Sequence, residues 1–117
     1  MNWKDKTIFI RDNLEIMRGM NSESVDLIYL DPPFNSNSNY AAPIGSKAAG
    51  AAFKDIWTLD DVKEYEHELL SETQPALYKI IEASEYTHSK GMKAYLIIMA
   101  VRLLEMHRIL KLSLIHI

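Results

Sequence analysis

Residues 25–34 read VDLIYLDPPF and contain the strongest structural signal in the chain. The first six are mostly apolar without strict alternation, a pattern typical of a strand in a parallel sheet covered on both faces. The strand should end at Asp31-Pro32-Pro33, because proline has no N–H to donate to a central ladder. The stretch therefore predicts a buried strand followed by a turn.

The flanking sequence predicts one βαβ unit and then helices. Residues 7–10, TIFI, favour a short strand, and apolar positions after Asp12 recur at helical spacing as far as Gly19. Pro75 suits the first turn of a later helix, and residues 92–111 favour the longest helix. Because a βαβ unit implies a parallel sheet, the expected fold class is α/β with a partial parallel sheet.

Two further segments connect these elements. Residues 35–57 predict a long irregular loop, which in a compact domain is usually functional or mobile. Thr58-Leu59-Asp60-Asp61 predicts the start of a helix, with a capping acid three residues after the threonine.

Composition limits the class of protein. A chain of 117 residues allows one domain, since domains usually run to about 100–200 residues. The absence of cysteine excludes disulfide frameworks, thiolate metal sites and cysteine nucleophiles. The longest apolar run, residues 94–101, is far shorter than the roughly 20 residues that cross a bilayer, and the N-terminus does not read as a signal peptide. A soluble, cytoplasmic protein is expected.

The turn after the strand carries groups suited to chemistry. In open α/β sheets, ligands bind at the carboxyl ends of strands, which is where Asp31, Pro32, Pro33 and Phe34 would lie. They offer a carboxylate, carbonyls of a segment without competing N–H groups, and an aromatic ring. The alternative is a turn that only terminates the strand.

Together with Asn35, this stretch resembles the catalytic motif of the DNA amino-methyltransferases, which methylate adenine at N6 or cytosine at N4. Residues 11–17, 53–59 and 91–96, continuing to Leu110-Lys111, resemble the segments around that motif. The match covers roughly residues 7–111 and is similar to the permuted subgroup, whose catalytic motif lies near the N-terminus. The resemblance implies an incomplete Rossmann-like methyltransferase fold, truncated at the C-terminus, from a group that includes modification subunits of restriction systems.

The resemblance also implies catalytic roles. The Asp31 carboxylate and the Pro32 carbonyl would accept the two N–H groups of the exocyclic amine, turning its lone pair toward the methyl group of S-adenosylmethionine. Phe34 would stack on a flipped-out base, and Pro33 would stiffen the turn. Aspartate at the first position implies adenine as the target, and cytosine stays open as the alternative.

Binding residues and partners follow from the same resemblance. Asp12, with Asp31, would bind the cofactor, although Asp12 could equally be a helix N-cap. Asn35, Tyr40, Lys47 and Lys54 are candidates for contact with double-stranded DNA, unless their loop is only a connector. A restriction subunit or a second copy of the chain is a further possible partner, and neither a metal site nor a membrane is expected.

One expected part is not found in the sequence. No G-x-G occurs in it, although the family binds its cofactor with a glycine-rich loop that lies downstream in the permuted subgroup. Residues 1–111 are therefore interpreted as the N-terminal catalytic-motif part of a methyltransferase domain, and residues 112–117 as a discordant, non-native tail. The chain alone is expected to be inactive. The rival hypothesis is a non-enzymatic helical interaction domain.

Overall fold

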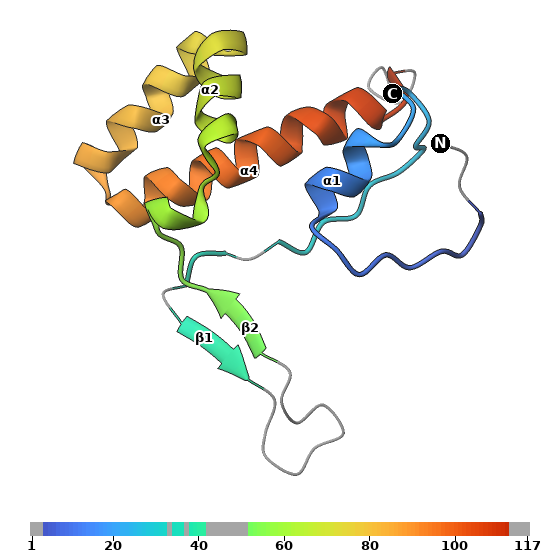
Figure 1. Cartoon of the computed structure of the whole chain (residues 1–117), viewed down its shortest axis with the longest axis horizontal. Helices are drawn as coiled ribbons and strands as arrows, with labels where there is room; N and C mark the ends of the chain where they lie inside the picture. The colour runs from blue at the N-terminus through green and yellow to red at the C-terminus, as the bar shows by residue number, and fades with distance from the viewer. Residues whose placement is uncertain (1–3, 33, 37, 42–51, 113–117) are drawn as a thin grey trace. The chain divides into compact units, whose positions relative to one another are not determined.

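The computed structural model describes residues 4–32, 34–36, 38–41 and 52–112. Its elements in chain order are α1 (Asn13–Arg18), β1 (Ser38–Ala41), β2 (Ala52–Asp55), the short 3₁₀ helix η1 (Leu59–Asp61), α2 (Glu64–Thr73), α3 (Pro75–Thr87) and α4 (Lys90–Ile109) (Figure 1). The chain divides into two compact units, one formed by Met1–Leu30 with Met99–Ile117 and the other by Asp31–Ile98. Helix α4 contributes residues to both units.

The prediction of an α/β, Rossmann-like fold with a partial parallel sheet is wrong. The described residues are predominantly helical, and their only sheet is the antiparallel pair of β1 and β2. Residues 7–10 and 25–30, both expected to be strands, form no strand ladder, and the parallel pairing found in the second segment is an isolated bridge between Val25 and Leu110. A strand is stable only beside neighbours that share its hydrogen bonds, so an apolar run alone does not produce one.

The first unit packs α1 against the C-terminal half of α4. Met17 of α1 and Met106 and Ile109 of α4 form a buried cluster, with Val25 and Ile28 packed against it. Backbone hydrogen bonds reinforce this contact, because Val25 donates to the carbonyl of Ile109 at 2.9 Å and accepts from the N–H of Lys111 at 2.9 Å. Part of the expected strand is thus held against the end of α4.

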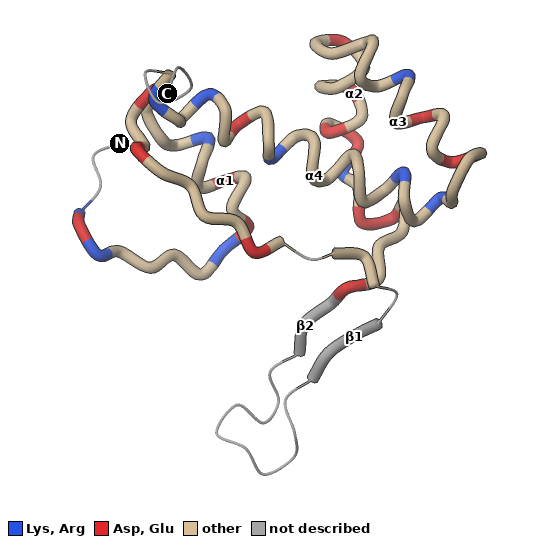
Figure 2. The backbone as a smooth tube through the Cα atoms, turned by 180° about the vertical axis from the view of Figure 1, so that it is seen from behind, with Lys and Arg blue, Asp and Glu red and all other residues tan. Residues whose placement is uncertain are grey.

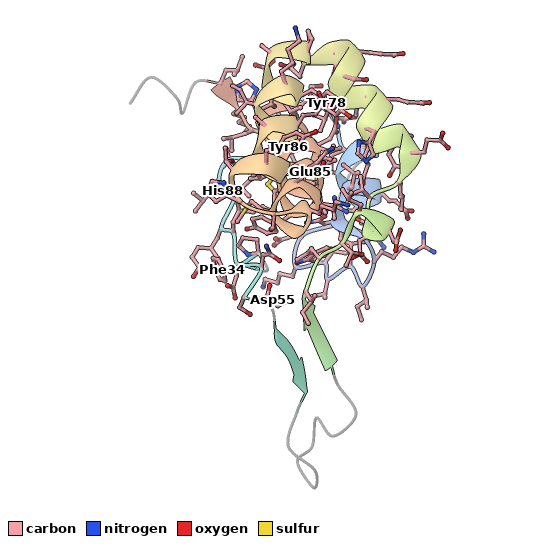
Figure 3. All side chains as sticks on the ribbon, turned by 90° about the vertical axis from the view of Figure 1, so that its left-hand side faces the viewer. Phe34, Asp55, Tyr78, Glu85, Tyr86 and His88 are labelled. Carbon is pink, nitrogen blue, oxygen red and sulfur yellow. The ribbon has the colours of Figure 1, made fainter. Side chains whose placement is uncertain are left out.

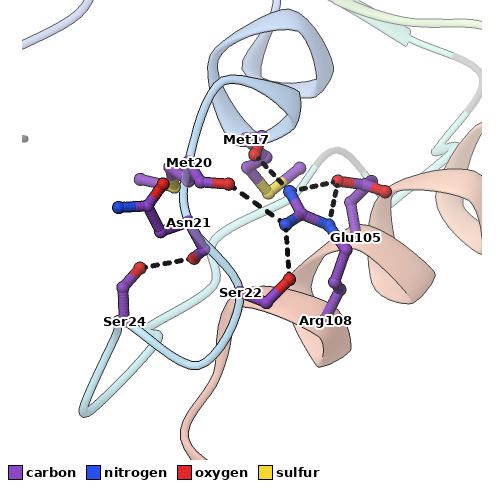
Figure 4. Close-up of polar contacts among 7 residues, drawn as sticks. All are labelled: Met17, Met20, Asn21, Ser22, Ser24, Glu105 and Arg108. Atoms are coloured by element: carbon purple, nitrogen blue, oxygen red, sulfur yellow. Dashed lines mark hydrogen bonds and ion pairs between the residues drawn. The ribbon is translucent and has the colours of Figure 1, made fainter. Parts of the chain in front are cut away.

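A single arginine joins α4 to the end of α1 (Figure 4). The Arg108 guanidinium donates to the carbonyls of Met17 at 2.8 Å and Met20 at 3.0 Å, and to the Ser22 hydroxyl at 3.0 Å. Its Nη2 atom also lies 2.9 Å from the Glu105 carboxylate. The Met17 carbonyl lies in the last turn of α1, where carbonyls have no partner within the helix, and it accepts from Arg108 as well as from the N–H of Met20.

The second unit contains α2, α3, the hairpin and the first part of α4. Leu70 of α2, Ile81 of α3, and Ala94 and Ile97 of α4 are its most buried apolar residues. Pro75 is at the first turn of α3, as the sequence predicts. The helix start expected at Thr58 is only the short η1, where the Asp61 carboxylate accepts the N–H of Thr58 at 2.8 Å.

Helix α2 begins later, at Glu64, and is strongly acidic (Figure 2). The carboxylate of Glu66, which is buried, accepts the N–H of Lys63 at 3.1 Å and so satisfies one backbone group at the helix start. An acid in the first turn also interacts favourably with the helix dipole. The high acid content of this segment is thus explained in part by helix capping.

Helices α3 and α4 are linked by an ion pair between Glu85 and Lys93, whose charged atoms lie 2.9 Å apart. The hydrogen bond from Lys93 lowers the pKa of the Glu85 carboxyl, and the hydrogen bond to Glu85 raises the pKa of the Lys93 ammonium. Both groups are therefore charged at neutral pH. No helix of the described segments is both long and apolar enough to cross a membrane.

Candidate functional site

The structure assigns neither a turn nor a bend to residues 31, 32 and 34, where the sequence predicts a turn. This predicted turn presents its acid and its aromatic ring to solvent. Asp31 is exposed, Pro32 is half-buried, and 72% of the Phe34 surface is accessible. Figure 3 labels Phe34. Pro33 lies outside the described residues. A carboxylate and a ring within four residues of each other, both accessible, can contact a flat polar ligand such as a nucleobase.

The backbone just after this turn is held by a carboxylate from the end of β2. Asp55 Oδ1 accepts the N–H of Asn35 at 2.7 Å, and Oδ2 accepts the N–H of Ser36 at 2.8 Å. Asp55 is 2% exposed, so these hydrogen bonds are shielded from competing water. Charge-assisted bonds of this length are among the strongest in proteins, and they connect segments about 20 residues apart in sequence.

The backbone conformation at Asn35 explains why Asp55 can accept both N–H groups. Asn35 has a φ of 57°, in the left-handed region, which asparagine tolerates better than most residues. The hairpin register pairs Ser38 with Asp55, so the end of β2 lies beside the start of β1, a few residues after Phe34. Phe34 and Asp55 are labelled at the same end of the hairpin in Figure 3.

The Asp55 carboxyl is kept ionised by its hydrogen bonds. The Ser36 hydroxyl contributes most to lowering its pKa below 3.8, and the N–H groups of Ser36, Asn35 and Phe34 add to the effect. Burial opposes this shift by disfavouring the charged form, but the hydrogen bonds outweigh it. The carboxylate is thus negatively charged at every pH near neutrality.

Asn35 has a second unusual feature, in its side chain. Its amide oxygen Oδ1 is buried, and no hydrogen bond to it is found among the described residues. Its backbone N–H is already taken by Asp55. Of the residues proposed to contact DNA, Asn35 is the one whose surroundings are described, and it lies directly beside Phe34.

Two of the other predicted DNA contacts, Tyr40 and Lys54, lie in the paired strands of the hairpin. Tyr40 is in β1, opposite Phe53, and Lys54 is in β2, opposite Asn39. Only the backbone is described at residues 38–41 and 52–54, and Lys47 lies outside the described residues. Part of the predicted irregular loop is therefore an antiparallel hairpin.

Asp12, the predicted cofactor ligand, belongs to the first unit and is engaged in structural contacts. Its Oδ1 atom accepts the N–H of Leu14 at 3.0 Å, which makes it the N-cap of α1. The guanidinium of Arg102 contacts the same carboxylate. The N-cap interpretation, which the sequence left open, is the one that the structure supports.

Sequence reasoning missed the role of Asp55. In the sequence, Asp55 is only one member of the segment 53–59 that resembles the family, and no local pattern marks an aspartate that binds backbone N–H groups about 20 positions earlier. A hairpin prediction over residues 38–55 would have been the only signal, because it would have placed Asp55 beside Ser36.

Comparisons with known proteins add no assignment. No family model, no curated protein and no solved structure matches the chain. Within the described residues, no group of three or more histidine or acidic side chains could hold a metal ion.

Proposed function

We propose that this chain carries the amine-binding turn of a site-specific DNA adenine-N6 methyltransferase. The observation that carries the proposal is that the Asp31 carboxylate and the Phe34 ring of the predicted turn are both exposed, while Asp55 binds the backbone just after Phe34. The proposal rests on this turn and on its sequence resemblance. It does not rest on the fold, which differs from the expected one.

The residues present match the needs of an exocyclic amine. The nitrogen is a poor nucleophile because its lone pair is delocalised into the ring of the base. Asp31 and the Pro32 carbonyl would accept its two hydrogens and so localise the lone pair, while Phe34 would hold the base by stacking. A carboxylate that only accepts hydrogen bonds suits this role because it need not remove a proton first.

The resemblance implies S-adenosylmethionine as the methyl donor and double-stranded DNA as the substrate. When bound, the cofactor would supply an electrophilic methyl group. The described residues do not fit its expected site, since Asp12 is occupied by Leu14 and Arg102. The proposed role of this chain is therefore confined to holding the base and its amine.

A binding experiment tests this role directly. The probe is a short single-stranded oligothymidylate with one central deoxyadenosine, because a single strand requires no base flipping. It is titrated into the isotope-labelled 117-residue chain, and the amide signals of Phe34, Asn35 and Ser36 are followed by NMR. We expect saturable shifts at these amides, and an affinity reduced about tenfold in Asp31→Asn, since the amide oxygen that replaces the carboxylate accepts a hydrogen bond without its charge.

The controls separate the contribution of the exocyclic N–H groups from that of base stacking. The same oligonucleotide with N6,N6-dimethyladenine stacks equally well but has no N–H to donate, so it should bind as weakly as the Asp31→Asn complex. Asp5→Asn removes another exposed aspartate and should leave binding unchanged. Equal affinity for the two oligonucleotides would refute the proposal, as would the absence of any binding. Tighter binding of an oligonucleotide with deoxycytidine would favour the cytosine-N4 alternative.

The second candidate is a non-enzymatic helical interaction domain. The predominantly helical structure favours it, as do Ile80 and Tyr86 of α3, which are 70% and 89% exposed. Under this reading the turn after Leu30 is only structural. The same titration separates the two candidates, because an interaction domain has no reason to distinguish adenine from its dimethylated form.

A further inference from the structure

We propose that Asp55 is a positioning residue of the base-binding turn, which sets the place of Phe34 without touching the base. This inference rests on the proposed function of the turn. It assigns to the hairpin β1–β2 the role of carrying a buried carboxylate to that turn.

The two prolines deprive the predicted turn of backbone hydrogen-bond donors. Pro32 and Pro33 have no N–H groups, so this part of the turn cannot be fastened by hydrogen bonds that its own backbone donates. The first N–H groups available after the prolines are those of Phe34, Asn35 and Ser36. Asp55 accepts the N–H groups of Asn35 and Ser36 at 2.7 and 2.8 Å, and the N–H of Phe34 also interacts with it.

Burial makes this attachment rigid. Asp55 is 2% exposed, whereas Phe34, one residue before the attachment point, is 72% exposed. A ring that stacks on a base must be accessible, so it cannot be held by packing into a core. It can be held through its backbone, and Asp55 is the described side chain that binds the backbone next to it.

The alternative is that Asp55 only closes the end of the hairpin. A matched carboxylate elsewhere in the same unit distinguishes the two roles. Asp61 accepts the backbone N–H of Thr58 at 2.8 Å and its hydroxyl at 3.1 Å, so it makes the same kind of contact at a place unrelated to the turn. Loss of either carboxylate removes an acceptor of backbone N–H groups, but only the loss of Asp55 should weaken binding of the base.

The test combines amide hydrogen exchange with the oligonucleotide titration on Asp55→Asn, Asp61→Asn and the unmodified chain. We expect exchange of the Asn35 and Ser36 amides to accelerate about tenfold or more in Asp55→Asn, and adenine-oligonucleotide affinity to fall about tenfold. Asp61→Asn should leave both quantities unchanged. Ser36→Ala removes only the hydroxyl that bonds Asp55 and should give a smaller change in the same direction, which provides a readout if Asp55→Asn does not fold.

Each outcome is decisive. Faster exchange in Asp55→Asn with unchanged affinity would overturn the positioning role while leaving the proposed function intact. Unchanged exchange would show that the contact is not made in solution and would overturn it as well. If the unmodified chain does not distinguish the adenine and dimethyladenine oligonucleotides, the proposed function itself fails, and this inference fails with it. Equal losses in Asp55→Asn and Asp61→Asn would assign both to general destabilisation.

Discussion

The Nη2 atom of Arg102 lies 2.9 Å from Oδ1 and 3.1 Å from Oδ2 of Asp12, so one guanidinium nitrogen contacts both oxygens of the carboxylate. The two residues are 90 positions apart in sequence. The Nε atom of the same arginine donates to the Asn13 side chain at 3.0 Å. The start of α1 is thus attached to α4 through polar groups, in addition to the apolar cluster around Met17.

We expect Asp12→Ala to lower the free energy of unfolding by about 1–2 kcal/mol, because it removes both an N-cap and a partly buried ion pair. Asp12→Asn retains a capping oxygen and should cost less. Urea denaturation followed by circular dichroism measures both. If instead Asp12→Ala keeps full stability and the chain binds S-adenosylmethionine only when Asp12 is present, the cofactor role would have to be restored.

At the other end of α1, Arg108→Met should lower the free energy of unfolding by about 1–3 kcal/mol, since the carbonyls of Met17 and Met20 lose a charged donor. Arg11→Met removes an exposed arginine and serves as the control. Amide exchange should show the loss concentrated in α1. Equal stability of the two variants would mean that water replaces the guanidinium without cost.

Gly91 lies at a close approach between α4 and the segment before η1. A Cβ atom at this position would lie 3.0 Å from the carbonyl oxygen of Trp57, a backbone atom that cannot move aside easily. Alanine favours a helix over glycine by about 1 kcal/mol, but overpacking costs about 1–3 kcal/mol. We therefore expect Gly91→Ala to be destabilising by about 1 kcal/mol in thermal or urea unfolding.

The control for this prediction is Gly19→Ala. Gly19 caps α1 at a φ of −77°, which any residue adopts, so this substitution should change stability little. A stabilised Gly91→Ala variant would show that the Trp57 segment yields to the added methyl group.

Elements with local signals could be predicted from sequence. Asp12 before a helical pattern, Pro75 at a first turn and the long apolar pattern of α4 all depend on residues within a few positions of each other, and each gives the expected helix. The strand predictions at residues 7–10 and 25–30 failed because a strand depends on neighbours elsewhere in the chain. Ile8, Ile10, Leu27 and Tyr29 are at least 83% exposed, so their apolar character is not matched by burial in this structure.

The residues of the candidate site also differ in whether local sequence signals could predict them. Asp31 and Phe34 could be singled out because the two prolines between them mark a turn in the sequence itself. Asp55 could not, because its partners Asn35 and Ser36 lie about 20 residues away and are reached only through the pairing of β1 with β2. An aspartate that binds distant backbone N–H groups cannot be recognised from the residue types around it.

The pH dependence of stability provides an independent check on Asp55. Its pKa is lowered from 3.8, mainly by the Ser36 hydroxyl and also by backbone N–H groups, so its folded value lies below its unfolded value. A group of this kind adds stability that is fully present above the unfolded pKa and is lost as the pH falls through the folded one. The stability difference between the unmodified chain and Asp55→Asn should therefore be constant above about pH 5 and shrink only below 3.8. Urea denaturation across this range measures the difference, and the amide shifts of Asn35 and Ser36 report protonation at the site itself. A difference that already closes well above pH 3.8 would show that burial dominates over the hydrogen bonds, which would require that Asp55 does not hold these N–H groups in solution.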